Sequence, residues 1–427
     1  GIRAVPLVFQ VCPPAAIGAC IQRFRTAPMP RPVPVETNKQ ANMHENQLTA
    51  MLEQGENAAI EFKSVGVRAE SLAREIVAFA NTQGGTILLG VNDARQIEGL
   101  TDDRNWEEWA MNIARTAVTP PLSPRYQEWQ QDGRRVGVLQ IERGHDKPYQ
   151  TTDGKFYVRV GSTNRSASAH ELMRLFQQAG FFHYDQTAVR GSSVADLNFA
   201  LLNRYFEKYE LNFQDEAPAE QRQILTNADI LTESGETTVA GLLVFGQTPA
   251  RWLPQAVIRF AHFVGHEPDS ELIDRKEIKG TLGDQIDQML VVIRNNLLAP
   301  SRILGARREE SPSYPDKVYR ELLANACLHR NYSIHGSGVR VLMYADRIEF
   351  ISPGKLPNTI TPEKLKIGVS YAVNPIIVKF MDNLRYTDRL GRGLPMVYRE
   401  SIKIGCPAEF IELGEEFRVI LPLPNRA

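Results

Sequence analysis

A stretch near the C-terminus, residues 317–332 with the sequence KVYRELLANACLHRNY, constrains what this chain can fold into more than any other segment. Three polar side chains, Glu321, Asn325 and His329, recur at every fourth position, so a helix would place them on one face while its apolar residues pack inward. An Asn oxygen can coordinate Mg²⁺, and a Glu one turn away can orient or deprotonate a water beside a γ-phosphate. The alternative is a polar helix face held by salt bridges to neighbouring arginines.

Two later segments give this helix a context that favours a phosphate site. Residues 338–357 predict two strands that end in a turn at Gly354. Residues 387–403 place Gly391 and Gly393 at the start of a helix, where backbone N–H groups could hold phosphate oxygens. A closing hairpin follows, and together these elements predict an α/β domain.

The first half of the chain predicts a second domain with mixed helices and strands. A helix with an apolar face is followed by a glycine pair and the apolar run TILLGV, which is typical of a strand buried on both faces. Two further strands and a capped helix complete the domain. The elements are expected at residues 70–81, 86–91, 134–142, 155–161 and 166–180.

Length bounds the organisation of the whole chain. Its 427 residues are enough for two or three domains, each with its own core. The two informative domains are expected to span residues 43–182 and 301–427, with an α/β connector at 183–300. The proline-rich residues 1–42 are interpreted as an extension that is disordered or not native. The predicted fold class is therefore α/β (α+β).

Charge and composition exclude several classes of protein. A formal net charge of −1 removes a whole-molecule basic field for nucleic acids but allows a local basic groove. The 4 cysteines form neither a CxxC pair nor a disulfide ladder, which argues against a zinc finger and favours a reducing, cytoplasmic location. No apolar run approaches the roughly 18–20 residues of a membrane span. No Gly-Lys-Ser/Thr phosphate loop is present, which excludes P-loop helicases and Ras-like GTPases.

Three carboxylates in the first domain are candidates for metal chemistry. Glu56 and Glu61 lie in GENAAIEFK, and Asp93 follows the buried strand. Brought together, they could hold Mg²⁺ or Mn²⁺, with Lys63 in contact with a phosphate. The alternative is that Glu56 and Asp93 are solvated turn residues and that Glu61 pairs with Lys63.

The VRVGSTNR turn is a candidate for contact with a nucleic-acid backbone. Its hydroxyl and guanidinium groups are of the kind that contact phosphates. The residues concerned are Arg159, Ser162, Thr163 and Arg165, together with Asn164. The alternative is a polar loop after an edge strand.

Three segments of the N-terminal half, in the order GENAAIEFK, IVAFANTQGGTILLGVND and FYVRVGSTNRSAS, together resemble the Schlafen-type AlbA domain. The resemblance implies a module that binds DNA or RNA. In eukaryotic members a carboxylate trio supports RNA cleavage, and Glu56, Glu61 and Asp93 match its positions. Bacterial-type relatives often keep these acids without an established nuclease role.

The order of an ExxxN helix, a strand hairpin, an SPG turn and a GxG helix resembles the GHKL ATPase or Bergerat fold, a two-layer α/β sandwich. The resemblance is greatest to a divergent branch found beside Schlafen-type AlbA domains, in proteins labelled helicase-related or transcriptional regulators. It implies ATP and Mg²⁺ as ligands. By position it implies a catalytic base at Glu321, a Mg²⁺ ligand at Asn325, an adenine turn at Gly354 and a phosphate lid at Gly391 and Gly393.

One departure from the GHKL pattern concerns the base of the nucleotide. The family's DxGxG motif has an Asp that accepts a bond from the adenine amino group, and Ser352-Pro353-Gly354 stands in its place. Base specificity is therefore open.

Together the two resemblances imply an ATP-binding, nucleic-acid-associated regulator, in which the C-terminal domain controls the N-terminal domain. Two alternatives remain: a metal-dependent ribonuclease that uses Glu56, Glu61 and Asp93, and a non-catalytic interaction scaffold. ATP hydrolysis and simple ATP retention are both compatible with the sequence, as is a homodimer. A membrane partner is not expected.

Overall fold

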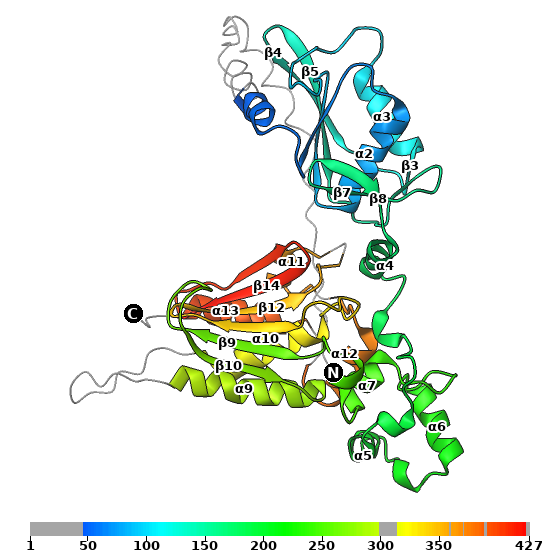
Figure 1. Ribbon diagram of the computed structural model, residues 1–427, viewed down its shortest axis with the longest axis vertical. Coiled ribbons are helices and arrows are strands. Elements are labelled where there is room, and N and C mark those ends of the chain that lie inside the picture. The colour runs from blue at the N-terminus through cyan, green and yellow to red at the C-terminus, as the bar shows by residue number, and fades with distance from the viewer. Residues whose placement is uncertain (1–45, 299–313, 358–359, 370, 388–390, 424–427) are drawn as a thin grey trace, which may run out of the picture.

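The computed structural model describes residues 46–298, 314–357, 360–369, 371–387 and 391–423 (Figure 1). The extension predicted at residues 1–42 lies outside the described residues. Within the described ranges, no helix combines the length and the apolar character needed to cross a membrane.

A four-stranded sheet forms the centre of the N-terminal part. Its strand order is β1-β2-β5-β4; β1 and β2 are parallel and the remaining pairs are antiparallel. The strands are β1 (Ile60–Lys63), β2 (Gly84–Leu89), β4 (Arg125–Gln131) and β5 (Arg134–Glu142).

Both faces of this sheet are covered, as the run TILLGV predicts. Ile87 and Leu89 pack with the helices α2 (Ala69–Asn81) and α3 (Trp106–Thr116), whereas Leu88 joins a separate cluster that contains Leu48 from the helical residues 46–54. Successive side chains of a strand point to opposite faces, so one apolar run can supply both layers.

A hairpin and a helix complete the N-terminal part. The hairpin of β7 (Tyr157–Val160) and β8 (Thr163–Ser166) packs against α2. Next comes α4 (Ala169–Gln178), the capped helix expected at residues 166–180, which begins with a capping box formed by Ser168 and Glu171. Figure 1 shows α4 at the junction between the N-terminal part and the rest of the molecule. A short ladder pairs β3 (Val118–Thr119) with β6 (Gln150–Thr151).

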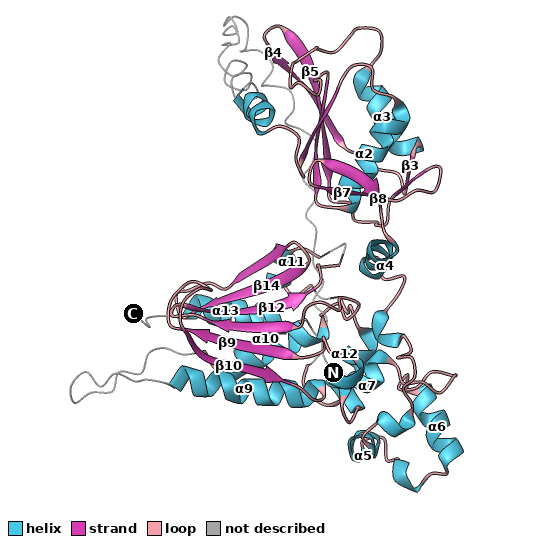
Figure 2. Cartoon of the chain, viewed as in Figure 1, coloured by secondary structure: helices cyan, strands magenta, loops and turns pink. Residues whose placement is uncertain are grey.

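The rest of the chain is built on a six-stranded sheet of order β10-β9-β11-β12-β14-β13 (Figure 2). β9 and β11 are parallel, and the other neighbours are antiparallel. The strands are β9 (Ile258–Phe263), β10 (Leu272–Ile278), β11 (Val339–Met343), β12 (Arg347–Pro353), β13 (Glu409–Leu413) and β14 (Glu416–Pro422).

Helices cover one face of this sheet. α10 lies between α9 and α13 and packs on β12, while α9 also packs on β9. The helices here are α9 (Leu282–Leu298), α10 (Asp316–Leu328), α11 (Pro362–Lys366), α12 (Pro375–Asn383) and α13 (Gly393–Lys403). The preceding segment adds α5 (Phe199–Glu207), α6 (Pro218–Asn227), α7 (Val239–Phe245) and α8 (Pro249–Trp252).

The separate connector predicted at residues 183–300 is corrected by this sheet. β9 and β10 come from that segment and pair with strands beyond residue 338, and one hydrophobic core runs from Val189 to Leu421. A boundary at residue 300 would cut through both the sheet and the core. The physical reason is that the parallel pairing of β9 with β11 joins segments far apart in the sequence, which local patterns do not reveal.

A buried carboxylate ties the start of this large unit to one of its last helices. Asp185 is 0% exposed, and its Oδ2 accepts hydrogen bonds from the backbone N–H groups of Ile376 (2.8 Å) and Ile377 (3.0 Å) in the first turn of α12. Within the described part of the chain, Oδ1 has no hydrogen-bond partner. Burial raises the pKa of Asp185 to about 6, although the two N–H groups oppose the rise.

We expect Asp185 to make stability fall as the pH rises. The folded state favours the neutral acid, so this contribution is complete below the unfolded pKa of about 4 and is lost as the pH passes about 6. The difference between the free energies of unfolding of the wild type and of Asp185→Asn should therefore depend on pH. Between about pH 5 and about pH 7.5 the wild type should lose about 1 kcal/mol relative to this variant. Urea titrations of both proteins at several pH values would measure it. A difference that does not vary with pH would contradict the prediction.

Candidate functional site

A cavity of about 340 Å³ lies in the C-terminal part of the molecule. The residues that sequence analysis selected for nucleotide chemistry all line it: Glu321, Asn325, His329, Gly354, Gly391 and Gly393. They come from α10, from the turn after β12 and from the start of α13. Most of the remaining lining is apolar, a combination typical of small-molecule sites.

Helix α10 supplies the polar end of the cavity. The side-chain amide of Asn325 donates through Nδ2 to the Glu321 carboxylate (Oε1, 2.6 Å) and to the Glu321 carbonyl (2.9 Å). These bonds hold the two side chains together one turn apart, as their spacing predicts. With Nδ2 engaged in this way, Oδ1 is the atom of Asn325 that a cation would take.

His329 closes the same helix at its C-terminal end. Burial lowers the pKa of His329 to about 4, so the imidazole is neutral near pH 7. A neutral ring can donate or accept a hydrogen bond in the cavity but offers no positive charge to a phosphate.

At two glycines that line the cavity, the backbone lies very close to neighbouring residues. A Cβ on Gly393 would lie 1.6 Å from Glu321 Oε1, so the carboxylate rests directly against the start of α13. Gly354 has a φ of +126°, and a Cβ there would lie 2.9 Å from the Cβ of Asn331. No other residue type fits either position without displacing its neighbour.

Ser352 stands where the GHKL pattern has its Asp, and its hydroxyl is already hydrogen-bonded within the protein. Ser352 is 5% exposed, and its Oγ donates to the carbonyl of Ala326 (2.7 Å) in α10. This side chain therefore helps to bind β12 to α10 as well as lining the cavity.

The cavity also contains residues that sequence analysis missed. Lys355 lines it and forms an ion pair with Glu415 (2.8 Å), and Leu356 and Tyr371 add apolar surface. The sequence signal nearest to Lys355 and Leu356 was the turn at Gly354. A single Lys or Leu in a loop forms no pattern that would predict a place in a binding site.

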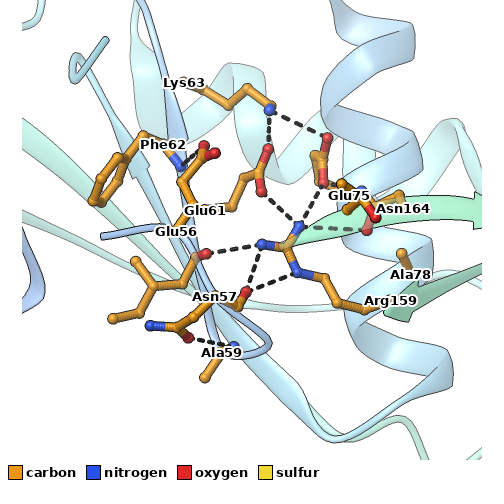
Figure 3. Close-up of polar contacts among 12 residues, drawn as sticks. Glu56, Asn57, Ala59, Glu61, Phe62, Lys63, Glu75, Ala78, Arg159 and Asn164 are labelled. Carbon is orange, nitrogen blue, oxygen red and sulfur yellow. Dashed lines mark hydrogen bonds and ion pairs between the residues drawn. The ribbon is translucent and has the colours of Figure 1, made fainter. Parts of the chain in front are cut away.

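The carboxylates of the N-terminal part form a different kind of site (Figure 3). Glu61 and Glu75 lie on either side of Lys63 and Arg159. Lys63 contacts Glu61 and lies 3.2 Å from Glu75, and Arg159 lies 2.5 Å from Glu61 and 3.5 Å from Glu75. Asn164 donates to Glu75. We call these five residues the acidic–basic cluster.

Ionic pairing within the cluster opposes the cost of burial. Burial raises the pKa of Glu75, and the charge of Lys63 counteracts the rise. For Lys63, burial acts to lower the pKa, but Glu61 and Glu75 outweigh it and raise the pKa overall. The cluster is therefore a set of mutually compensating charges.

The predicted metal-binding trio is corrected by this arrangement. Glu56 is exposed, and its Oε1 accepts a hydrogen bond from the backbone N–H of Phe62 (3.1 Å), while Asp93 is exposed in the turn after β2. Within the described residues, no three Asp, Glu, His or Cys side chains form a group that could hold a metal ion. The two oxygens of Glu61 are instead engaged by cations, Oε1 by Lys63 and Oε2 by Arg159, and Glu56 uses an oxygen to bond the backbone.

Glu75 is the member of the cluster that sequence analysis missed. It lies in the middle of α2 among apolar residues, one turn from Leu72 and Phe79, and is itself buried. The sequence did hold a signal for Glu75: it is a charged residue within the apolar face of a predicted helix. Such a residue is rarely buried without a partner of opposite charge.

Arg159 does not have the exposed position that phosphate contact requires. Its side chain is 1% exposed and donates to the backbone carbonyls of Asn57 (2.7 Å) and Ile60 (2.8 Å) in addition to Glu61. It also stacks over the ring of Phe79, at 4.7 Å from the centroid. Arg159 is therefore a structural residue that joins β7 to β1 and α2.

Three other residues of the predicted turn, Ser162, Thr163 and Arg165, are exposed at the tip and in the second strand of the β7–β8 hairpin. Ser162 and Thr163 face solvent, and Arg165 forms a double ion pair with Glu171 at 2.6 and 2.7 Å. Their contact with phosphates stays a prediction.

The two arginines of this hairpin allow a matched test of stability. Arg159→Ala should lower the free energy of unfolding by about 3–5 kcal/mol, because it leaves buried carboxylates without their cation. Arg165→Ala removes an exposed pair and should change stability little. Chemical denaturation followed by circular dichroism would measure both. Equal effects of the two substitutions would refute the buried-cluster interpretation.

Two family models match separate parts of the chain. The model described as Schlafen, AlbA_2 matches residues 56–168, and the model described as "Putative ATP-dependent DNA helicase recG C-terminal" matches residues 336–421. No curated protein matches significantly.

Solved structures give partial likenesses. The crystal structure of the DIP2311 protein from Corynebacterium diphtheriae is 19% identical, covers 91% of this chain and 70% of its own, and has a TM-score of 0.43. The solution structure of the N-terminal domain of a RecG-related protein from Nitrosomonas europaea is 25% identical, covers 30% of this chain and 93% of its own, and has a TM-score of 0.22. From the family models, the chain carries a Schlafen AlbA_2 domain followed by a domain of the recG C-terminal type.

Proposed function

We propose that this protein is an ATP-binding, nucleic-acid-associated regulator, in which a GHKL-type C-terminal domain controls the Schlafen AlbA_2 domain. The convergence of Glu321, Asn325, His329 and three glycines on one cavity carries this proposal. These residues are spread over more than 70 positions of the chain, from Glu321 to Gly393, and the sequence patterns alone favour nucleotide chemistry for the group.

The cavity fits Mg-ATP by the chemistry of its donors. Asn325 offers an amide oxygen of the kind that Mg²⁺ accepts, and Mg²⁺ would there offset the negative charge of phosphates. Gly393 lets the backbone at the start of α13 lie close to Glu321, and Gly391 lines the same cavity, so N–H groups there can donate to phosphate oxygens. The hydrogen bond from Asn325 to Glu321 supports Glu321 as the proposed base that accepts a proton from a water if ATP is hydrolysed.

The N-terminal domain is proposed to contact DNA or RNA through the exposed β7–β8 hairpin, including Ser162, Thr163 and Arg165. The net charge of −1 requires any such contact to be local. Metal-dependent RNA cleavage is not proposed, since Glu61 is neutralised by two cations and the trio is not assembled.

Asn325→Ala should weaken Mg-ATP binding to the full chain by about tenfold or more. Loss of residues that merely support a metal ligand costs about tenfold to hundredfold, so loss of the ligand itself should cost at least as much. Isothermal titration calorimetry of the two proteins would measure the change.

The matched control for this titration is Asn227→Ala. Asn227 is an exposed helical Asn that also pairs with the residue one turn earlier, Gln223, but lies on α6. This control should bind Mg-ATP like the wild type, and thermal melts would show whether either variant is destabilised. Unchanged affinity in Asn325→Ala would remove Asn325 from the site, and no binding to the wild type would refute the nucleotide proposal.

Mg-ATP should change the affinity of the full chain for nucleic acid. Coupling between sites in one protein is typically worth about fivefold or more in affinity. Fluorescence anisotropy with labelled DNA and RNA oligonucleotides, at one fixed salt concentration, would measure the change with and without Mg-ATP. The change should be absent in Asn325→Ala and present in Asn227→Ala. Equal affinities in the wild type with and without Mg-ATP would contradict control by the C-terminal domain.

A further inference from the structure

The backbone of one cavity residue is held from two sides by an ion pair between the domains. Glu412 of β13 accepts a hydrogen bond from the backbone N–H of Leu356 through Oε2 (2.9 Å) and contacts Arg143 through Oε1. Arg143 comes directly after β5 of the N-terminal domain, and its NH2 group donates to the carbonyl of Leu356 (3.2 Å). The pair thus engages both backbone groups of Leu356, which lines the cavity. We call Arg143, Glu412 and Leu356 the clamp.

A second ionic contact lies beside the clamp. Glu415 pairs with Lys355 of the cavity (2.8 Å) and lies 3.8 Å from Arg174 of α4, while its backbone carbonyl accepts a bond from the N–H of Gly354 (2.7 Å). The turn 354–356 is therefore held on one side by β13 and the turn after it, and on the other by Arg143 of the N-terminal half.

Helix α4 contacts residues next to the cavity, and Gly180 after it approaches a residue that lines the cavity. The Gln177 side-chain oxygen accepts from Asn331 (3.2 Å) and Ser333 (3.0 Å), and the Asn331 N–H donates to the carbonyl of Pro353 (2.8 Å), next to Gly354. A Cβ on Gly180 would lie 2.2 Å from the hydroxyl of Tyr371, which also lines the cavity.

We propose that the clamp couples the cavity to the docking of the N-terminal domain, with Arg143 acting as a positioning residue for Leu356. This inference rests on the proposed function for the identity of the ligand, Mg-ATP. A ligand against Leu356 orders the backbone that Arg143 and Glu412 hold, so filling the cavity strengthens the Arg143–Glu412 contact. By thermodynamic reciprocity, loss of that contact weakens binding of the ligand, although Arg143 does not line the cavity.

The clamp is well suited to this role because it is partly enclosed. The side chains of Arg143 and Glu412 are 23% and 8% exposed, so solvent screens the pair less than it screens a surface pair. The Glu412 carboxylate bonds Arg143 and the backbone N–H of Leu356 at the same time. Movement of Leu356 therefore alters the contact between Glu412 and Arg143, and movement of Arg143 alters the contact between Glu412 and Leu356.

A double-mutant cycle with the full chain tests the coupling. Arg143→Ala should weaken Mg-ATP binding by about fivefold or more, Glu412→Gln should act similarly, and the double variant should lose less than the product of the two factors. The matched control is Arg135→Ala, which removes an arginine with carboxylate partners, Asp102 and Glu128, from the other end of β5. Two results would overturn the proposal. One is a loss of Mg-ATP affinity in the double variant equal to the product of the two single losses, and the other is an equal Mg-ATP affinity of Arg143→Ala and Arg135→Ala.

Hydrogen exchange tests the clamp independently of any ligand. Without Mg-ATP, Arg143→Ala and Glu412→Gln should each speed exchange of the Leu356 amide and of residues 143–147, whereas Arg135→Ala should leave both unchanged. Unchanged exchange at Leu356 in Arg143→Ala would overturn the coupling even if Mg-ATP binds. Faster exchange together with no Mg-ATP binding to the wild type would support the clamp and refute the proposed ligand.

Discussion

The cavity depends on the close approach of α13 to α10, where Gly393 leaves room for the carboxylate of Glu321. Because no Cβ intervenes, Glu321 lies against the start of α13 while it accepts a hydrogen bond from Asn325. Gly354 makes a second close approach, to Asn331, and brings the turn after β12 against the chain just beyond α10. A Cβ at Gly393 would displace the Glu321 carboxylate, and a Cβ at Gly354 would displace Asn331, so a side chain at either position would disturb the region around the polar end of the cavity.

The two clusters of polar residues differ in how their charges are used. In the N-terminal domain, Glu61 and Glu75 contact Lys63 and Arg159, and the arginine also bonds two backbone carbonyls. Burying an ion costs several kcal/mol unless it is paired, so each charge of the cluster depends on the others, and together they fix how β1, α2 and β7 meet. At the cavity, by contrast, Glu321 and Asn325 border a hollow of about 340 Å³. This contrast favours the cavity over the acidic–basic cluster as the place for ligand chemistry.

Much of the local structure could be predicted from the sequence, and the errors have a common cause. The helix expected at 317–332 is observed at Asp316–Leu328, and the capping box at Ser168 is confirmed. The separate connector was wrong because β9 pairs with β11 across about 80 residues. The prediction that Arg159 contacts phosphates from an exposed turn was wrong. The hairpin packs on α2 and turns this side chain inward, and the sequence of a hairpin does not indicate which element packs against it.

The sequence by itself determined which side chains share a helix face, where glycines permit close approach and which residue types could hold a nucleotide. Those properties follow from the 3.6-residue period and from backbone sterics, which act over a few positions. The tertiary structure alone decided that Glu75 meets Arg159 and that Arg143 and Glu412 hold Leu356. These contacts join residues between 56 and 269 positions apart, and they form only when whole layers pack together.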